Sequence, residues 1–199
     1  MYLVFDTETN TFPRWNSPPS DPNQARIVQI AMLLLDDAFN EKASFKSLVC
    51  PSGAKWTMSD GAQQAHGISE SDCYAYGIST KSAMQIFAEM SEKCELVICH
   101  NVKFDTFMID IECAQVDMLF RFDWHNSSFC TMESSTPICK MPKTSNRGPN
   151  EYKWPKLSEA YEILIGKPLE GAHDAMVDVR ATAAIFRFLK MHHSLVSQD

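Results

Sequence analysis

The sequence has no apolar stretch long enough to cross a lipid bilayer. Its longest nearly continuous apolar run covers residues 27–35, and Gln29 interrupts it, whereas a membrane-spanning helix needs about 20 apolar residues. The N-terminal residues also lack the basic region, apolar stretch and small-residue cleavage site of a secretion signal. We therefore expect a protein that has no membrane partner.

Short signatures of several protein classes are missing as well. The chain has seven cysteines but no Cys-x-x-Cys, and a scattered, odd set argues against a disulfide scaffold or a zinc ribbon. We expect reduced thiols and a cytoplasmic location. The chain also has no G-x-x-x-x-G-K-S/T, no H-E-x-x-H and no G-x-S-x-G, so nothing supports an NTPase, a zincin or a serine hydrolase.

The chain has no excess of basic residues. It contains 18 Lys and Arg against 25 Asp and Glu, which gives a formal net charge of −7. A globally basic field therefore does not hold nucleic acid on this protein. The length of 199 residues and the 45% hydrophobic content are those of one ordinary globular domain with a substantial core.

The order of apolar segments predicts an α/β fold with a mixed sheet. Five segments have the length and composition of strands, and they are residues 2–5, 26–35, 43–49, 95–99 and 129–132. Helices are expected after the capping residues Ser59, Ser79 or Thr80, Asn101 and Asp174, and over residues 157–165. The proline-rich segments 10–25 and 134–156 are expected to be loops.

Two carboxylates end the first expected strand. Asp6 and Glu8 are separated by one residue, so the alternation of side chains along a strand puts them on the same side of a sheet. Paired carboxylate oxygens suit Mg²⁺ or Mn²⁺. The spacing alone carries little weight, because Asp110 and Glu112 repeat it. We expect this second pair to be ordinary solvated helix charges.

Two further acids and a histidine stand at expected helix starts. Asp105 follows the strand at 95–99, where α/β proteins place their sites; a first-turn acid favoured by the helix dipole is the alternative. Asp178 falls in the first turn of the last helix, and His173 precedes it. A histidine there can act as a general base on a water held near Asp178, or it can be an exposed residue of a capping segment.

The three motifs, taken in order, resemble those of the DEDDh-type 3′–5′ exonucleases, the DnaQ-like branch of the ribonuclease H-like superfamily. The matching segments are Phe5-Asp6-Thr7-Glu8-Thr9, His100-Asn101-Val102-Lys103-Phe104-Asp105 and His173-Asp174-Ala175-Met176-Val177-Asp178. The resemblance covers nearly the whole chain. It implies a single ribonuclease H-like exonuclease domain over residues 1–199, with a mixed five-stranded sheet flanked by helices.

The resemblance also implies an activity. The expected enzyme is a metal-dependent 3′–5′ exonuclease that hydrolyses phosphodiester bonds of DNA or RNA and releases nucleoside 5′-monophosphates. Two Mg²⁺ or Mn²⁺ ions are its expected cofactors. By resemblance, Asp6 bridges both ions, Glu8 and Asp178 hold the ion that carries the attacking water, and Asp105 supports the second ion. His173 takes the proton from that water.

Substrate contacts follow from the same resemblance. His66-Gly67-Ile68 matches a family segment that lines the terminal nucleotide. The Gly-Leu that often follows the first motif is replaced by Asn10-Thr11-Phe12-Pro13, so Phe12 is the expected base-wedging residue. The full expected set of substrate-binding residues is Thr7, Thr9, Phe12, His66, Ile68, Asn101, Phe104, Lys153 and Trp154.

Lys153 and Trp154 enter this set because of a locally basic segment. Residues 140–156 contain five cations and one acid, with Tyr152 and Trp154 between them. Phosphate contacts combined with base stacking hold single strands. A solvated loop with Trp154 packed on the core is the alternative, and for Trp15 in the other loop packing is favoured. Loops 10–25 and 134–156 are expected to be substrate-side insertions.

The expected partner is a single-stranded nucleic acid with a free 3′ end, bound by a monomer or a homodimer. Two other functions fit the same residues. One is a catalytically silent member of the fold that acts as a binding module. The other is a metal-dependent phosphohydrolase that acts on small nucleotides and leaves oligomers intact.

Overall fold

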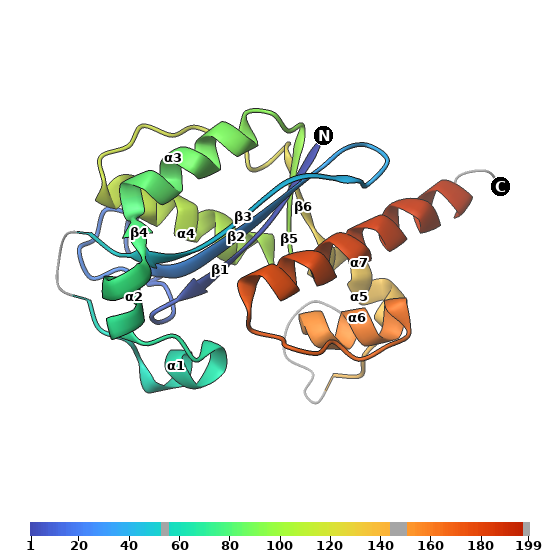
Figure 1. Cartoon of the computed structure of the whole chain (residues 1–199). Helices are drawn as coiled ribbons and strands as arrows, with labels where there is room; N and C mark the ends of the chain where they lie inside the picture. Colours follow the sequence, from blue (N-terminus) through green and yellow to red (C-terminus); the bar gives the residue numbers. More distant parts are fainter. Residues whose placement is uncertain (53–55, 144–150, 197–199) are drawn as a thin grey trace.

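The computed structural model describes residues 1–52, 56–143 and 151–196, and these residues form a six-stranded sheet with helices on both faces (Figure 1). The strands are β1 (Tyr2–Thr9), β2 (Ile27–Leu35), β3 (Glu41–Cys50), β4 (Ile78–Ser79), β5 (Leu96–Cys99) and β6 (Ser128–Cys130). Their order across the sheet is β4-β3-β2-β1-β5-β6. The expected mixed α/β sheet is confirmed. A sixth strand is added because the two-residue β4, too short for a periodic signal, pairs with β3 at the edge.

Strand β1 has a central place in this sheet. It runs antiparallel to β2 and parallel to β5. Leu3 and Phe5 belong to one core cluster, whereas Val4 belongs to the cluster on the opposite face. Since side chains alternate along a strand, Asp6 and Glu8 continue on the Val4 face.

Helices cover both faces of the sheet. Helices α3 (Thr80–Ser91) and α4 (Val102–Gln115) pack on the Leu3 face, and α7 (Ala175–Val196) crosses the Val4 face (Figure 1). The remaining helices are α1 (Asp60–His66), α2 (Glu70–Tyr76), α5 (Thr131–Cys139) and α6 (Leu157–Ile165). Within the described ranges, no helix combines the length and the apolar character that a membrane span requires.

All four expected capping residues stand where their helices begin, and three of them cap through the side chain. Ser59 accepts the backbone N–H of Ala62 at the start of α1, Ser79 caps α3, and Asp174 accepts two backbone N–H groups of α7. Asn101 also stands at the N-cap position of α4, but it does not cap the helix through its side chain. Its backbone adopts the left-handed conformation, with φ of 79°, and its side chain makes no capping hydrogen bond.

Two helices were not expected from the sequence. Helix α2 follows a capping box of Ser69 and Asp72. Helix α5 takes the end of the segment expected to be a strand at 129–132 and the first part of the expected loop at 134–156. Pro137 in that segment suggests a break. Yet a proline late in a short helix removes only one backbone hydrogen bond, so α5 forms despite it.

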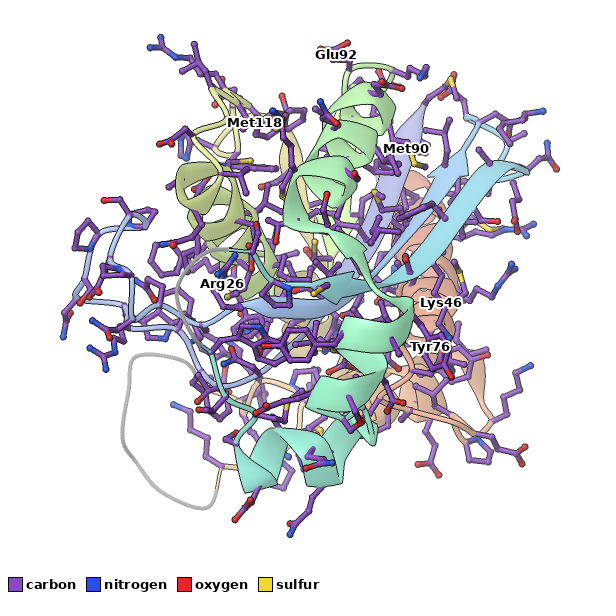
Figure 2. All side chains as sticks on the ribbon, turned by 60° about the vertical axis from the view of Figure 1, so that its left-hand side comes forward. Arg26, Lys46, Tyr76, Met90, Glu92 and Met118 are labelled. Atoms are coloured by element: carbon purple, nitrogen blue, oxygen red, sulfur yellow. The ribbon has the colours of Figure 1, made fainter. Side chains whose placement is uncertain are left out.

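A buried ion pair joins Arg26, the residue before β2, to α4 and corrects the expectation for Glu112. The side chains of Arg26 and Glu112 are 3% and 0% exposed, and their closest charged atoms are 2.8 Å apart. Glu112 also accepts the backbone N–H of Ile27 at 2.6 Å. Figure 2 shows Arg26 inside the molecule, between the sheet and its covering helices. Glu112 is therefore an internal structural residue, whereas Asp110 is partly exposed.

Candidate active site

The first two carboxylates of the site come from the end of β1. Asp6 and Glu8 project on the sheet face that α7 covers, as their alternation with Val4 requires. The pairing of β1 with β2 changes register between Glu8 and Thr9. Such an irregularity disrupts regular pairing and changes the direction of neighbouring side chains, and here it directly follows Glu8.

Asp105 reaches the same place from the other face of the sheet. It lies in the first turn of α4 and is 2% exposed. Its Oδ1 accepts the Thr7 hydroxyl at 2.8 Å and the Thr7 backbone N–H at 3.1 Å. Two donors on one oxygen fix the orientation of this carboxylate. Thr7 thus holds Asp105 in place, and its direct contact with substrate stays a prediction.

The last acid and the histidine come from the start of α7. Asp178 is 7% exposed, and its Oδ2 accepts the backbone N–H of His173 at 3.1 Å. The backbone of His173 has a left-handed φ of 70°, and its side chain is exposed. This hydrogen bond closes a tight turn that keeps the imidazole beside the Asp178 carboxylate.

Ligand atoms from three of these residues converge. One atom each from Glu8, His173 and Asp178 lie within 4.8 Å of one another. Burial raises the pKa of Asp6 well above its usual range, and the charges of Asp105, Glu8 and Asp178 raise it further. Four carboxylates from β1, α4 and α7 therefore share one electrostatic environment.

The residues of this cluster fit divalent cations. The second carboxylate oxygen of Asp178, Oδ1, is buried and finds no hydrogen-bond partner among the residues that the structure describes. A buried oxygen of this kind normally has a partner. Carboxylate oxygens are the hard ligands that Mg²⁺ and Mn²⁺ prefer. A bound cation also offsets the repulsion between the charged carboxylates.

The cluster makes stability depend on pH when cations are removed. Burial, with the charges of Asp178 and Asp105, raises the pKa of Glu8 from 4.5 to about 8. Between these values the folded chain holds a proton that the unfolded chain has lost, so stability falls as pH rises, by up to about 1.4 kcal/mol per pH unit. Urea unfolding in chelator should show a more stable protein at about pH 5 than at about pH 8.

Added Mg²⁺ or Mn²⁺ should restore stability at the higher pH, because the cation replaces the proton. The Glu8→Gln variant is the matched control, since it cannot take up that proton and should show a flatter dependence. A chelated wild-type protein whose stability rises steadily across this pH range would contradict the expected sign.

A cavity of about 230 Å³ opens beside Glu8. It is lined by Thr7, Glu8, Thr9, Thr11, Phe12, Ser59, Gly61, Ala62, Ala65, His66 and Phe104. Five residues expected to bind substrate therefore line the same cavity as Glu8, and they are Thr7, Thr9, Phe12, His66 and Phe104. Phe12 is 83% exposed at this cavity, which suits a side chain that inserts against a base.

His66 lines the cavity, whereas Ile68 is buried in the core. The Nδ1 atom of His66 accepts the Ile68 backbone N–H at 3.0 Å, so Nε2 carries the proton and faces the Thr9 carbonyl at 3.3 Å. Burial lowers the pKa of His66, which keeps the ring neutral. The Ile68 side chain packs in a core cluster with Val28 and Trp56 and is not part of the cavity wall, so its expected substrate contact has no support from the structure.

Residues 100–104 of the second motif support the backbone that leads to Asp105. Asn101 takes its left-handed conformation in the turn from β5 to α4. His100 is bonded on both ring nitrogens, at 3.0 Å to the Thr131 hydroxyl and at 3.0 Å to the Pro155 carbonyl. Burial lowers its pKa. His100 thus ties the segment before α6 to the end of β5.

Lys153 and Trp154 do not line the cavity that Glu8 borders. The Lys153 ammonium binds both oxygens of Glu159, at 2.7 and 2.9 Å, which neutralises its charge. Trp154 is 49% exposed and lines a separate cavity together with Glu133 and Glu151. This acidic wall disfavours a polyanion. Arg147, also part of the expected basic segment, lies outside the described residues.

The sequence reasoning missed two residues that hold the His173 segment. Gln29 is 7% exposed, lies opposite Glu8 in the β1–β2 pairing, and accepts the Ala175 backbone N–H at 3.0 Å. The Lys46 ammonium pairs with Asp174. The available signal was Gln29 itself, a single polar residue within the apolar β2 segment.

Solved structures with a similar fold are those of exonuclease I. The E. coli exonuclease I complex with a dT13 oligonucleotide is 19% identical, with a TM-score of 0.76 over 99% of this chain and 42% of that chain. The complex with dA16 is 20% identical, with a TM-score of 0.74 over 96% and 40%. The zinc-bound form of the E. coli complex with single-stranded DNA is 20% identical, with a TM-score of 0.68 over 96% and 40%.

These likenesses establish the fold, and the chain spans about two fifths of the length of those proteins. No curated protein sequence matches the chain significantly. A family model described as Exonuclease (RNase_T) matches residues 3–186, nearly the whole chain. The resemblance inferred from the three motifs is thereby confirmed, and the chain belongs to the exonuclease family.

Proposed function

We propose that this chain is a metal-dependent 3′–5′ exonuclease that removes nucleoside 5′-monophosphates from the 3′ end of a single strand. The observation that carries the proposal is the convergence of Asp6, Glu8, Asp105 and Asp178 beside His173. These groups come from β1, α4 and the segment that begins α7, and Glu8 among them lines a cavity large enough for part of a nucleotide.

The acids are the proposed holders of two Mg²⁺ or Mn²⁺ ions. Such a pair supplies an activated water, neutralises charge on the phosphoryl oxygens and stabilises the leaving oxygen. Asp6, the carboxylate whose pKa responds to all three others, is the proposed shared ligand. Glu8 and Asp178 complete one site, and Asp105, oriented by Thr7, supports the other.

His173 is the proposed general base. Its ring is exposed and one nitrogen lies within 4.8 Å of ligand oxygens of Glu8 and Asp178. From there the imidazole can take a proton from a water that attacks the terminal phosphodiester and pass it to solvent. The expected substrate residues Thr9, Phe12 and Phe104 line the same cavity as Glu8.

His173→Gln is expected to lower kcat by about a hundredfold, the lower range for a lost general base, while KM for an oligonucleotide changes little. Steady-state kinetics measure kcat and KM. His125→Gln, which changes another exposed histidine, is the matched control, and a His173→Gln rate equal to that control would refute the assignment.

The substrate class is proposed from the cavity and from the relatives. E. coli exonuclease I has been solved with dT13 and dA16 oligonucleotides, which supports a single strand for this chain too. The free cysteines support the expected cytoplasmic location, which stays a prediction. We likewise propose that residues 1–199 form one exonuclease domain and that loops 10–25 and 134–156 contact the substrate.

One gel series tests the proposal. Single-stranded and duplex DNA and RNA, labelled at the 5′ end, are incubated with Mg²⁺, Mn²⁺ or chelator. A ladder that shortens from the 3′ end and disappears in chelator is the expected result. Intact oligomers with hydrolysis of free nucleotides would indicate a small-nucleotide phosphohydrolase, and binding without any hydrolysis would indicate a silent binding module.

A further inference from the structure

We propose that Trp15 is a stacking platform for a base of the single strand upstream of the terminal nucleotide. The platform consists of the Trp15 indole seated on Phe107 of α4, next to the cavity of the active site. This inference rests on the proposed exonuclease function and adds to it a substrate contact in the loop between β1 and β2.

The ring geometry leaves one face of the indole for a ligand. The Trp15 and Phe107 rings are stacked, with centroids 5.0 Å apart and planes at 16°. Phe104 meets Trp15 edge-on, with centroids 6.4 Å apart and planes at 61°. Despite both contacts Trp15 is 55% exposed. A tryptophan that serves only packing would bury more of its large apolar surface.

The platform is continuous with the active site. Phe104 touches Trp15 and also lines the cavity that Glu8 and Phe12 border. Phe107 lies two residues beyond Asp105 on α4, a rise of about 3 Å along the helix. A strand whose 3′ end occupies the cavity therefore passes close to the indole.

The loop that carries Trp15 is held in a fixed conformation. Gln24 is 4% exposed, and its side chain accepts the Arg14 backbone N–H at 2.9 Å and donates to the Arg14 carbonyl at 3.0 Å. Gln115 of α4 donates to the carbonyls of Pro19 and Asp21, at 3.2 and 3.0 Å. Because the loop is anchored on α4, the indole is preorganised and loses little entropy when a base stacks on it.

Positive charge accompanies the platform. Arg14 precedes Trp15, and its side chain is exposed. Lys103 is exposed on α4 four residues before Phe107, so both project from the same helix face. On a chain of net charge −7, cations beside an exposed aromatic ring are the combination that holds a single strand through phosphates and stacking.

The test compares two substrates of the same enzyme. The first is a 5′-labelled oligothymidylate of about a dozen nucleotides, and the second is the p-nitrophenyl ester of thymidine 5′-monophosphate, which has one base only. Trp15→Leu keeps apolar cover over Phe107 and removes the aromatic face. It should raise KM for the oligonucleotide by about tenfold, within the range for one lost base stack, with kcat and ester hydrolysis unchanged.

Trp15→Tyr should recover most of the oligonucleotide affinity, because a second aromatic face replaces the first. Tyr76→Ala is the control, since Tyr76 is 76% exposed on α2 and lies away from this loop (Figure 2). Equal KM values for wild type and Trp15→Leu on the oligonucleotide would overturn the inference, and so would an equal loss on both substrates. If wild type shortens no oligonucleotide at all, the proposed function itself fails.

Discussion

Asp6→Asn is expected to reduce exonuclease turnover by about four orders of magnitude while the protein stays folded. The substitution keeps the size of the side chain and removes its charge. Among the four acids, Asp6 is the one whose pKa is raised by all three others after burial, so its charge is coupled to the whole cluster. When catalytic groups act as a unit, the removal of one of them abolishes nearly the whole rate enhancement.

The measurement is single-turnover cleavage of a 5′-labelled oligonucleotide in saturating Mn²⁺, together with thermal unfolding in chelator. Unfolding should move to higher temperature in Asp6→Asn, because the variant relieves repulsion and burial of charge. Asp110→Asn is the matched control, since Asp110 belongs to the second Asp-x-Glu of the chain and its carboxylate accepts the Trp124 indole N–H at 3.1 Å. Cleavage by Asp6→Asn at the rate of that control would remove Asp6 from the site.

The parts of the site that the sequence predicts are those set by local periodicity. Asp6 and Glu8 share a face because a strand alternates, and Val4 shows which face it is. Asp105 and Asp178 fall in first turns because apolar strands and capping residues mark where α4 and α7 begin. Each of these placements depends on fewer than ten neighbouring residues.

The parts that the sequence does not predict depend on contacts between distant segments. The Gln29 amide meets the start of α7 across 146 residues, and nothing near Gln29 in the chain indicates that partner. Lys153 stands in a basic segment, yet Glu159 neutralises it once α6 has formed. Ile68 follows His66 in the motif, but its apolar side chain turns into the core. Local patterns contain no information on which partner a side chain meets.

Glu112 shows most clearly that contacts between distant segments are not predicted by local patterns. Its spacing from Asp110 suggests a solvated helix charge, and its partner Arg26 is 86 residues away in the sequence. The guanidinium also donates to the Ser52 carbonyl at 2.8 Å, and the Arg26 backbone N–H donates to the Asn10 side chain at 2.6 Å. The pair therefore joins α4, which carries Asp105, to the segment that follows β1 and to the start of β2.

Glu112→Gln is accordingly expected to lower the free energy of unfolding by about 3–5 kcal/mol, the cost of leaving one charge of a buried pair uncompensated. The glutamine keeps the side-chain volume and one acceptor for Ile27, so the loss reports the charge of Arg26 and not a cavity. Urea unfolding in chelator measures it, with Asp110→Asn on the same helix as the control.

The double variant Arg26→Met with Glu112→Leu separates charge from packing. Apolar residues of similar volume can replace a buried ion pair with little net cost, although here the Ile27 N–H and the Ser52 carbonyl lose their partners. The double variant should therefore be more stable than Glu112→Gln and less stable than wild type. If Glu112→Gln unfolds at the same urea concentration as the control, the pair contributes no stability, and α4 must be held against the sheet by its apolar face alone.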